Sequence, residues 1–198
     1  MYGQTETSTR ISHLLPKNSK IKIGSVGKPI PGVELKIVND EGKEAQIEEI
    51  GEIIVKGSNI MKGYYKRNEL TQQSIHDGWL FTGDMGKLDR DGFLYIVGRK
   101  KNVIIKGGMN IYPEEIEEII LLNPIVEEVC VYGESNELLG EVPIARVILK
   151  SNAVNIKEDD LKRYCFRNMT SFKIPDRFEF VTELPKTDSG KIIRTPFQ

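Results

Sequence analysis

The chain has 198 residues, of which 39% are hydrophobic and 29% are charged, a composition typical of a globular protein with one or two domains. Lysine and arginine total 28 against 29 aspartates and glutamates, so a formal charge of -1 gives no broad positive field, and we expect no binding of nucleic acid or of an anionic membrane. No apolar run approaches the roughly 20 residues that span a bilayer, and the first residues do not resemble a secretory signal. We therefore expect a cytoplasmic protein without a transmembrane segment.

The residues from Ile21 to about Val97 have the pattern of a β-rich region. Short runs with β-branched residues, bounded by glycine or aspartate turns, lie at 33–40, 51–57 and 91–98. The polar stretch at 66–75 predicts one short helix. Several short strands at close spacing favour a small barrel or a curled sheet.

The pattern changes at residues 98–113, where basic residues and glycines surround a short apolar run, which favours a hinge followed by a hairpin. Pro113 suits the first turn of a helix that Asn123 ends. Two strands, an amphipathic helix and a last strand are then predicted at 126–133, 142–149, 157–169 and 176–182. The expected fold class is α+β, with a barrel-like β subdomain at residues 1–98 and a small α/β domain at residues 99–198.

Two motifs within residues 1–98 offer groups that could contact a nucleotide. In YGQTE, residues 2–6, Thr5 supplies a hydroxyl and Glu6 a carboxylate, the groups that meet a phosphate and its magnesium ion. The same residues also suit a disordered or helix-capping start. In GWLFTGD, residues 78–84, Asp84 at a strand end could accept hydrogen bonds from two ribose hydroxyls, or it could cap a turn.

Two further motifs lie in the second region. GRKK at 98–101 and KGG at 106–108 combine cations that donate to hydroxyl or phosphate oxygens with glycines that permit large dihedral changes, although a solvated basic turn has the same composition. PKTDSGKIIR at 185–194 presents Lys191 on a glycine-containing loop, which could carry an ammonium to a site where negative charge develops. A lysine in a polar loop is also commonly only solvated.

In this order and spacing, the four motifs resemble the adenylate-forming superfamily, which includes acyl-CoA synthetases, peptide-synthetase adenylation domains and luciferases. The resemblance covers essentially the whole chain. It implies that residues 1–98 are the last β-rich subdomain of a larger N-terminal domain and that residues 99–198 are a small, mobile C-terminal lid domain.

The resemblance also implies a role for each matching residue. The residues implied to bind the nucleotide are Tyr2 at the adenine, Thr5 at phosphate, Asp84 and Arg99 at the ribose hydroxyls, and Ile96, which would touch the nucleotide from the strand before the hinge. Glu6 would hold magnesium, and Lys101 would be the hinge residue. Gly107 and Gly108 would lie along the path of the pantetheine arm of coenzyme A, and Lys191 would be the catalytic lysine that assists acyl-adenylate formation.

The implied activity is that of an ATP-dependent acyl-CoA synthetase, with ATP, magnesium and coenzyme A as cofactors and a carboxylic acid as substrate. KKNVIIKGGMNIYPEEIE and SGKIIR resemble the enzymes for fatty or medium-sized acids. The sequence leaves open a ligase that loads carrier-protein phosphopantetheine and a truncated, noncatalytic homologue that acts as an interaction module. No phosphate-binding loop of the SGTTGxPKG type occurs in the sequence, so we expect a C-terminal fragment that is inactive alone.

Overall fold

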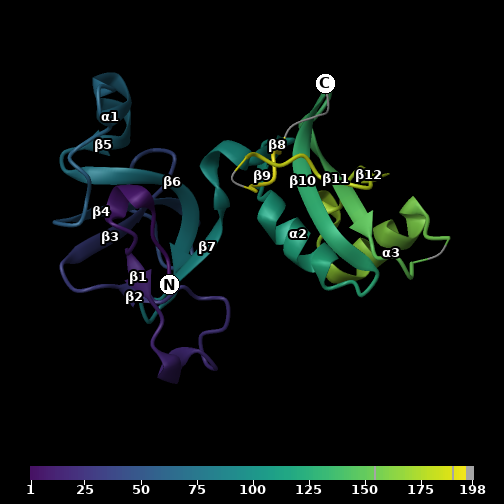
Figure 1. The fold of residues 1–198 in the computed structure, drawn as a ribbon, viewed down its shortest axis with the longest axis horizontal. Helices are drawn as coiled ribbons and strands as arrows, with labels where there is room; N and C mark the ends of the chain where they lie inside the picture. Colours follow the sequence, from purple (N-terminus) through teal and green to yellow (C-terminus); the bar gives the residue numbers. More distant parts are fainter. Residues whose placement is uncertain (154, 189, 195–198) are drawn as a thin grey trace. The chain divides into compact units, whose positions relative to one another are not determined.

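A computed structural model describes residues 1–153, 155–188 and 190–194. The chain forms two compact units, Met1–Lys100 and Lys101–Gln198. Each unit has its own hydrophobic core. The first unit consists mainly of strands, and the second combines a sheet with two helices (Figure 1), so the mixed α and β fold predicted from the sequence is confirmed.

The first unit is built on an antiparallel sheet. Its strands are β1 (Ser12–His13), β2 (Lys28–Pro29), β3 (Val33–Val38), β4 (Gly51–Gly57), β5 (Ile75–His76), β6 (Trp79–Leu88) and β7 (Leu94–Arg99). Its helical segments are η1 (Thr5–Thr7), η2 (Pro16–Asn18) and α1 (Asn68–Ser74). The strand order is β3-β4-β6-β5, with β7 also paired to β6, while β1 and β2 form a separate pair.

This sheet is open. Within the described part of the first unit, no pairing joins β3 to β5 or β7, so the barrel-like arrangement expected from the sequence is not a closed barrel. Closure requires strands that tilt and stagger around the whole circumference, and the edge strand β5 has only two residues. The core beneath the sheet gathers apolar side chains from four of its strands and from the residue just before β1: Ile11, Ile37, Ile53, Val55, Leu80 and Leu94.

The second unit is a helix-covered sheet. Its strands are β8 (Ile104–Lys106), β9 (Met109–Ile111), β10 (Val126–Asn136), β11 (Gly140–Leu149) and β12 (Arg177–Phe180). Its helical segments are α2 (Pro113–Leu121), α3 (Glu158–Asn168) and η4 (Ser171–Lys173), and η3 (Lys100–Asn102) precedes β8. The order is β10-β11-β8-β9, and β12 runs parallel to β11. The hairpin after residue 98 and both predicted helices are confirmed.

Side-chain alternation along the strands decides which face the helices cover. Val129 and Val131 of β10 share one core with Ile116 and Ile120 of α2 and with Leu161 of α3. Because successive strand residues point to opposite faces, Tyr132 and Ile144 lie in a separate cluster on the other face. Figure 1 shows α2 and α3 packed along the β10–β11 layer. No helix in the described ranges is long and apolar enough to cross a membrane.

Candidate functional site

Asp84 is the centre of a polar cluster in the first unit. Its side chain is buried, with the residue 5% exposed, and it lies on β6. Oδ2 accepts hydrogen bonds from the Tyr2 hydroxyl at 2.6 Å and from Gln4 Nε2 at 2.7 Å, while Arg99 Nε lies 2.7 Å from Oδ1. A carboxylate has about four lone-pair positions, so three donors leave it able to accept one more. The carboxylate is thus held rigidly and still has capacity for a ligand hydroxyl.

A bulge in β6 directs this carboxylate. The register of β6 against β4 shifts between the Ile54↔Phe81 and Glu52↔Met85 pairs, and Gly83 between them has a φ of +70°. Bulges bend a strand and re-aim the side chains within them. The sequence predicted that Asp84 ends a strand, and that prediction is wrong, because β6 continues to Leu88. The Thr-Gly-Asp step is a bulge and not a terminus.

The bulge is held by Glu52 and Gln4, two side chains for which the sequence predicted no role. Glu52 is buried, and its Oε1 accepts a hydrogen bond from the Gly83 N–H at 3.1 Å. Its Oε2 lies 2.7 Å from Lys100 Nζ, so the same carboxylate also fixes the residue after Arg99. On the other side, Gln4 Nε2 donates to the Thr82 carbonyl at 2.8 Å as well as to Asp84. One signal for Glu52 was present, a charged residue within the apolar run GEIIV.

Tyr2 is fixed in its neutral form. Burial, followed by the negative charge of Asp84 and the hydrogen bond to it, raises the pKa of the Tyr2 hydroxyl well above its ordinary value. The hydroxyl therefore stays a donor to Asp84 throughout the physiological pH range. The backbone of Tyr2 pairs with Ser12, which anchors the ring to the sheet region.

Thr5 and Glu6 lie on the short η1 turn. Thr5 is exposed, whereas Glu6 is half-buried and its Oε1 accepts a hydrogen bond from the Tyr64 hydroxyl at 2.9 Å. Burial and this hydrogen bond raise the pKa of Tyr64. A Cβ atom at Gly3 would collide with the Thr9 carbonyl, so the glycine of YGQTE is required for close packing. Among the described residues, no group of three or more His, Cys, Asp or Glu side chains could hold a metal ion.

Ile96 lies on β7, the strand that also carries Arg99. It pairs with Gly86 of β6 and packs, half-buried, against the core of the first unit. Asp84 pairs with Arg99 in the same ladder. The structure therefore brings both Tyr2 and Arg99 into contact with Asp84 and places Ile96 further along β7.

The remaining predicted residues belong to the second unit. Lys101 lies in η3 and is exposed. Gly107 and Gly108 form the turn between β8 and β9 with φ values of +56° and +81°, as a two-residue hairpin turn requires. The Gly107 N–H donates to the Leu139 carbonyl at 2.7 Å, and the space beside Gly108 is open.

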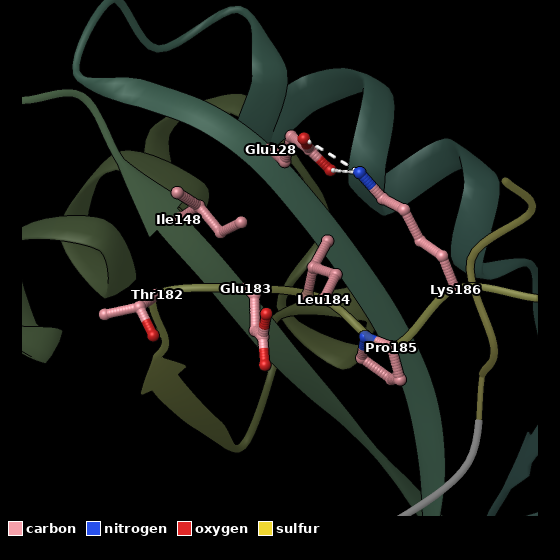
Figure 2. A pocket seen from close by; sticks show the side chains of 7 residues that line it. All are labelled: Glu128, Ile148, Thr182, Glu183, Leu184, Pro185 and Lys186. Atoms are coloured by element: carbon pink, nitrogen blue, oxygen red, sulfur yellow. Dashed lines mark hydrogen bonds and ion pairs between the residues drawn. The ribbon is translucent and has the colours of Figure 1, made fainter.

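Lys191 is exposed on a tight turn, residues 187–191, which we call the Lys191 turn; Ser189 within it lies outside the described residues. The Thr187 N–H donates to the Lys191 carbonyl at 2.8 Å, and the Lys191 N–H donates to Thr187 Oγ1 at 3.2 Å. The segment leading into the turn lines an open pocket of about 480 Å³ (Figure 2), together with Glu128 and Ile148. Figure 2 also shows Lys186 reaching across to Glu128.

Two family models match the chain. The model of the AMP-binding enzyme matches residues 1–65, and the model of the AMP-binding enzyme C-terminal domain matches residues 115–191. Among curated proteins, the chain is 48% identical over 193 residues to a 2-succinylbenzoate–CoA ligase of Geobacillus kaustophilus, covering 98% of this chain and 39% of the relative. A ligase of the same name from Bacillus cytotoxicus is 42% identical, with the same coverage.

Solved structures agree with these matches. The o-succinylbenzoate CoA synthetase of Bacillus subtilis in complex with its acyl-adenylate intermediate superposes with a TM-score of 0.91 at 41% identity, covering 97% of this chain and 39% of that one. ATP-bound MatB of Rhodopseudomonas palustris gives a TM-score of 0.85 at 36% identity, covering 96% and 38%. The chain thus spans about two fifths of the length of these relatives.

Proposed function

This chain belongs to the AMP-binding, adenylate-forming enzyme family, and from that premise we propose that it is the C-terminal part of an ATP-dependent acyl-CoA synthetase. In the proposed reaction, a carboxylate attacks the α-phosphorus of ATP and releases pyrophosphate, which gives an acyl-adenylate. The thiol of coenzyme A then attacks the acyl carbon and AMP leaves. Residues 1–98 would complete the large domain of that enzyme, and residues 99–198 would be its mobile lid.

The buried Asp84 cluster is the observation that carries this proposal. Its carboxylate is oriented by Tyr2, Gln4 and Arg99 and retains capacity for a further donor. A rigid, buried acceptor beside a guanidinium suits the vicinal hydroxyls of a ribose, which donate to carboxylates in many nucleotide sites. Tyr2 and Ile96 would then lie at the adenine side, and Thr5 would contact phosphate.

Lys191 and Glu6 supply the charges that phosphoryl chemistry requires. An exposed ammonium on the Lys191 turn can lie against the oxygens on which negative charge develops, which lowers the barrier to attack by an anionic carboxylate. Magnesium, which would neutralise phosphate oxygens when bound, usually takes only one or two protein carboxylates together with substrate phosphates. Glu6 suits that donor set, because only its Oε1 is hydrogen-bonded within the described part of the chain.

For the acid, we infer 2-succinylbenzoate from the names of the relatives that match nearly the whole chain. A fatty acid, which the sequence favoured, has no such support and stays a prediction. The proposed acceptor is the thiol of coenzyme A, because the relatives that match nearly the whole chain are named CoA ligases. Gly108 leaves open space at the β8–β9 turn where the pantetheine arm would pass.

Pyrophosphate exchange and thioester formation test the proposal in the complete protein that contains this chain. ATP–pyrophosphate exchange is measured with 2-succinylbenzoate, benzoate and octanoate, and thioester formation is then measured with coenzyme A or with a phosphopantetheinylated carrier protein. We expect the complete protein to catalyse ATP–pyrophosphate exchange and to form the coenzyme A thioester with 2-succinylbenzoate. We expect neither activity from the 198-residue chain alone. Exchange with octanoate only would overturn the acid, and no exchange with any acid would overturn the activity.

A further inference from the structure

Arg194 follows Lys191 by three residues and has no role in the scheme above. We propose that Arg194 is a positioning residue for Lys191, because its ion pair with Glu117 fastens the Lys191 turn to helix α2. The inference rests on the proposed function of Lys191, but the attachment itself can be measured separately.

The ion pair is bidentate and partly buried. Arg194 NH2 lies 2.7 Å from Glu117 Oε2, and Arg194 Nε donates to Oε1 at 3.2 Å. The two side chains are only 24% and 11% exposed. Glu117 is itself fixed, since its Oε1 also accepts the Val131 N–H of β10 at 2.7 Å. A planar guanidinium on a fixed carboxylate holds orientation as well as distance.

The Lys191 turn transmits this constraint over a short distance. Lys186 and Ile192 are bridged, and the Ile193 N–H donates to the Pro185 carbonyl at 2.8 Å, so the turn is closed on both sides like a small hairpin. Arg194 is the next residue along the chain. Releasing Arg194 would therefore free one end of the hairpin that presents Lys191.

The attachment on the other side of the turn is weaker. Lys186 Nζ lies 2.8 Å from Glu128 Oε2, but these side chains are 42% and 38% exposed. Figure 2 shows this pair among the side chains that line the open pocket. Exposed pairs are screened by solvent and constrain little. Arg194 is therefore the principal anchor.

Helix α2 also holds the chain that follows the proposed hinge. Glu114 stands one helical turn before Glu117, on the same face. Its Oε1 accepts a hydrogen bond from Asn102 Nδ2 at 3.1 Å and lies 3.8 Å from Arg194 NH2. Asn102, next to the proposed hinge residue, and Arg194, just after the Lys191 turn, are thus attached to the same turn of helix α2. A rotation about Lys101 would carry the Lys191 turn with α2 as one body.

The test uses Arg194→Gln and Arg194→Lys in the complete ligase. We expect Arg194→Gln to slow acyl-adenylate formation by roughly 10- to 100-fold, because a small misplacement of a reacting group has an effect of that order. Thioester formation from supplied acyl-adenylate should not change. Arg194→Lys should recover part of the rate, since it keeps the charge but loses the fork. Glu117→Gln removes the partner charge with little change in shape and should act in the same direction.

Hydrogen exchange in the 198-residue chain provides the second readout. The amides of Thr187, Gly190 and Lys191 should exchange faster in Arg194→Gln than in the parent chain. The matched control is Arg177→Gln, which removes another bidentate arginine of the same unit, paired with Glu134 at 2.8 and 3.0 Å. We expect this control to change neither the exchange of the turn nor adenylation.

The outcomes separate the inference from the proposal on which it rests. Unchanged exchange in Arg194→Gln, or equal slowing of both half-reactions, overturns the positioning role. The positioning role is also overturned if the amides of the Lys191 turn exchange faster in Arg194→Gln but this variant adenylates normally, while Lys191→Ala adenylates slowly. If Lys191→Ala adenylates normally as well, the function proposed for Lys191 fails first and the positioning role fails with it.

Discussion

Asp84 and its partners stabilise the first unit as well as forming the candidate site. A buried carboxylate without partners would be strongly destabilising, and here Arg99 compensates its charge while Tyr2 and Gln4 satisfy its lone pairs. The family resemblance implied that Tyr2, Asp84 and Arg99 all bind the nucleotide. The hydrogen bond from the Tyr2 hydroxyl to the carboxylate of Asp84 could not be predicted, since the two residues are 82 positions apart and local patterns carry no pairing information.

Tyr2→Phe tests this cluster at the level of one atom. It removes the hydroxyl donor and leaves buried Asp84 with one partner fewer, so we expect the free energy of unfolding of the first unit to fall by about 1–3 kcal/mol. Tyr65→Phe is the matched control, because Tyr65 is exposed, and it should change stability by less than about 0.5 kcal/mol. Urea denaturation of the 198-residue chain measures both. Equal effects of the two variants would contradict the geometry of the cluster.

The raised pKa of Tyr2 predicts a difference in the pH dependence of stability between the parent chain and Tyr2→Phe. A group whose pKa is higher in the folded state stabilises the fold fully below its unfolded pKa, near 10, and loses that contribution as the pH rises above it. The parent chain should therefore lose stability more steeply above pH 10 than Tyr2→Phe does. Parallel stability curves for the two proteins above pH 10 would show that Tyr2 keeps its ordinary pKa in the fold.

At the scale of elements, the segments with a regular sequence pattern could be predicted, and the bulged strand β6 could not. Helix α2 followed from Pro113 at its start and Asn123 after its end, and β4 followed from an apolar run between glycines. β6 was missed as one long strand, because Thr82, Gly83 and Asp84 are residues typical of turns. Tertiary pairing on both sides, with β4 and with β7, keeps that segment in the sheet as a bulge.

Gly83→Ala tests the bulge. The φ of +70° makes a side chain at Gly83 strained by about 1–2 kcal/mol even though the space around it is open. Gly92→Ala is the matched control, with a φ of +76° and open space in the turn before β7. Both should lower stability similarly, but only Gly83→Ala should raise the KM for ATP in the complete protein, because it shifts Asp84, the proposed ribose ligand. Equal KM values would argue against a nucleotide role for the bulge.

At the scale of the whole molecule, the proposed activity assigns different tasks to two units with separate cores. The Asp84 cluster, which we propose binds the nucleotide, belongs to the first unit and Lys191 to the second. The two half-reactions present different nucleophiles in the same space, so a lid that turns about Lys101 would bring Lys191 in for adenylation and remove it for thioester formation. On this account, losing Lys191 should affect one half-reaction only.

The most direct measurement is a comparison of the two proposed half-reactions in the complete protein that contains this chain, carrying Lys191→Ala. Acyl-adenylate formation is followed by pyrophosphate release, and thioester formation is followed from supplied acyl-adenylate and coenzyme A. Lys186→Ala, an exposed lysine at the entrance to the same turn, is the control. We expect Lys191→Ala to slow adenylation by about 100-fold or more and to leave thioester formation unchanged. Equal slowing of both steps, or normal adenylation, would contradict the role proposed for this chain.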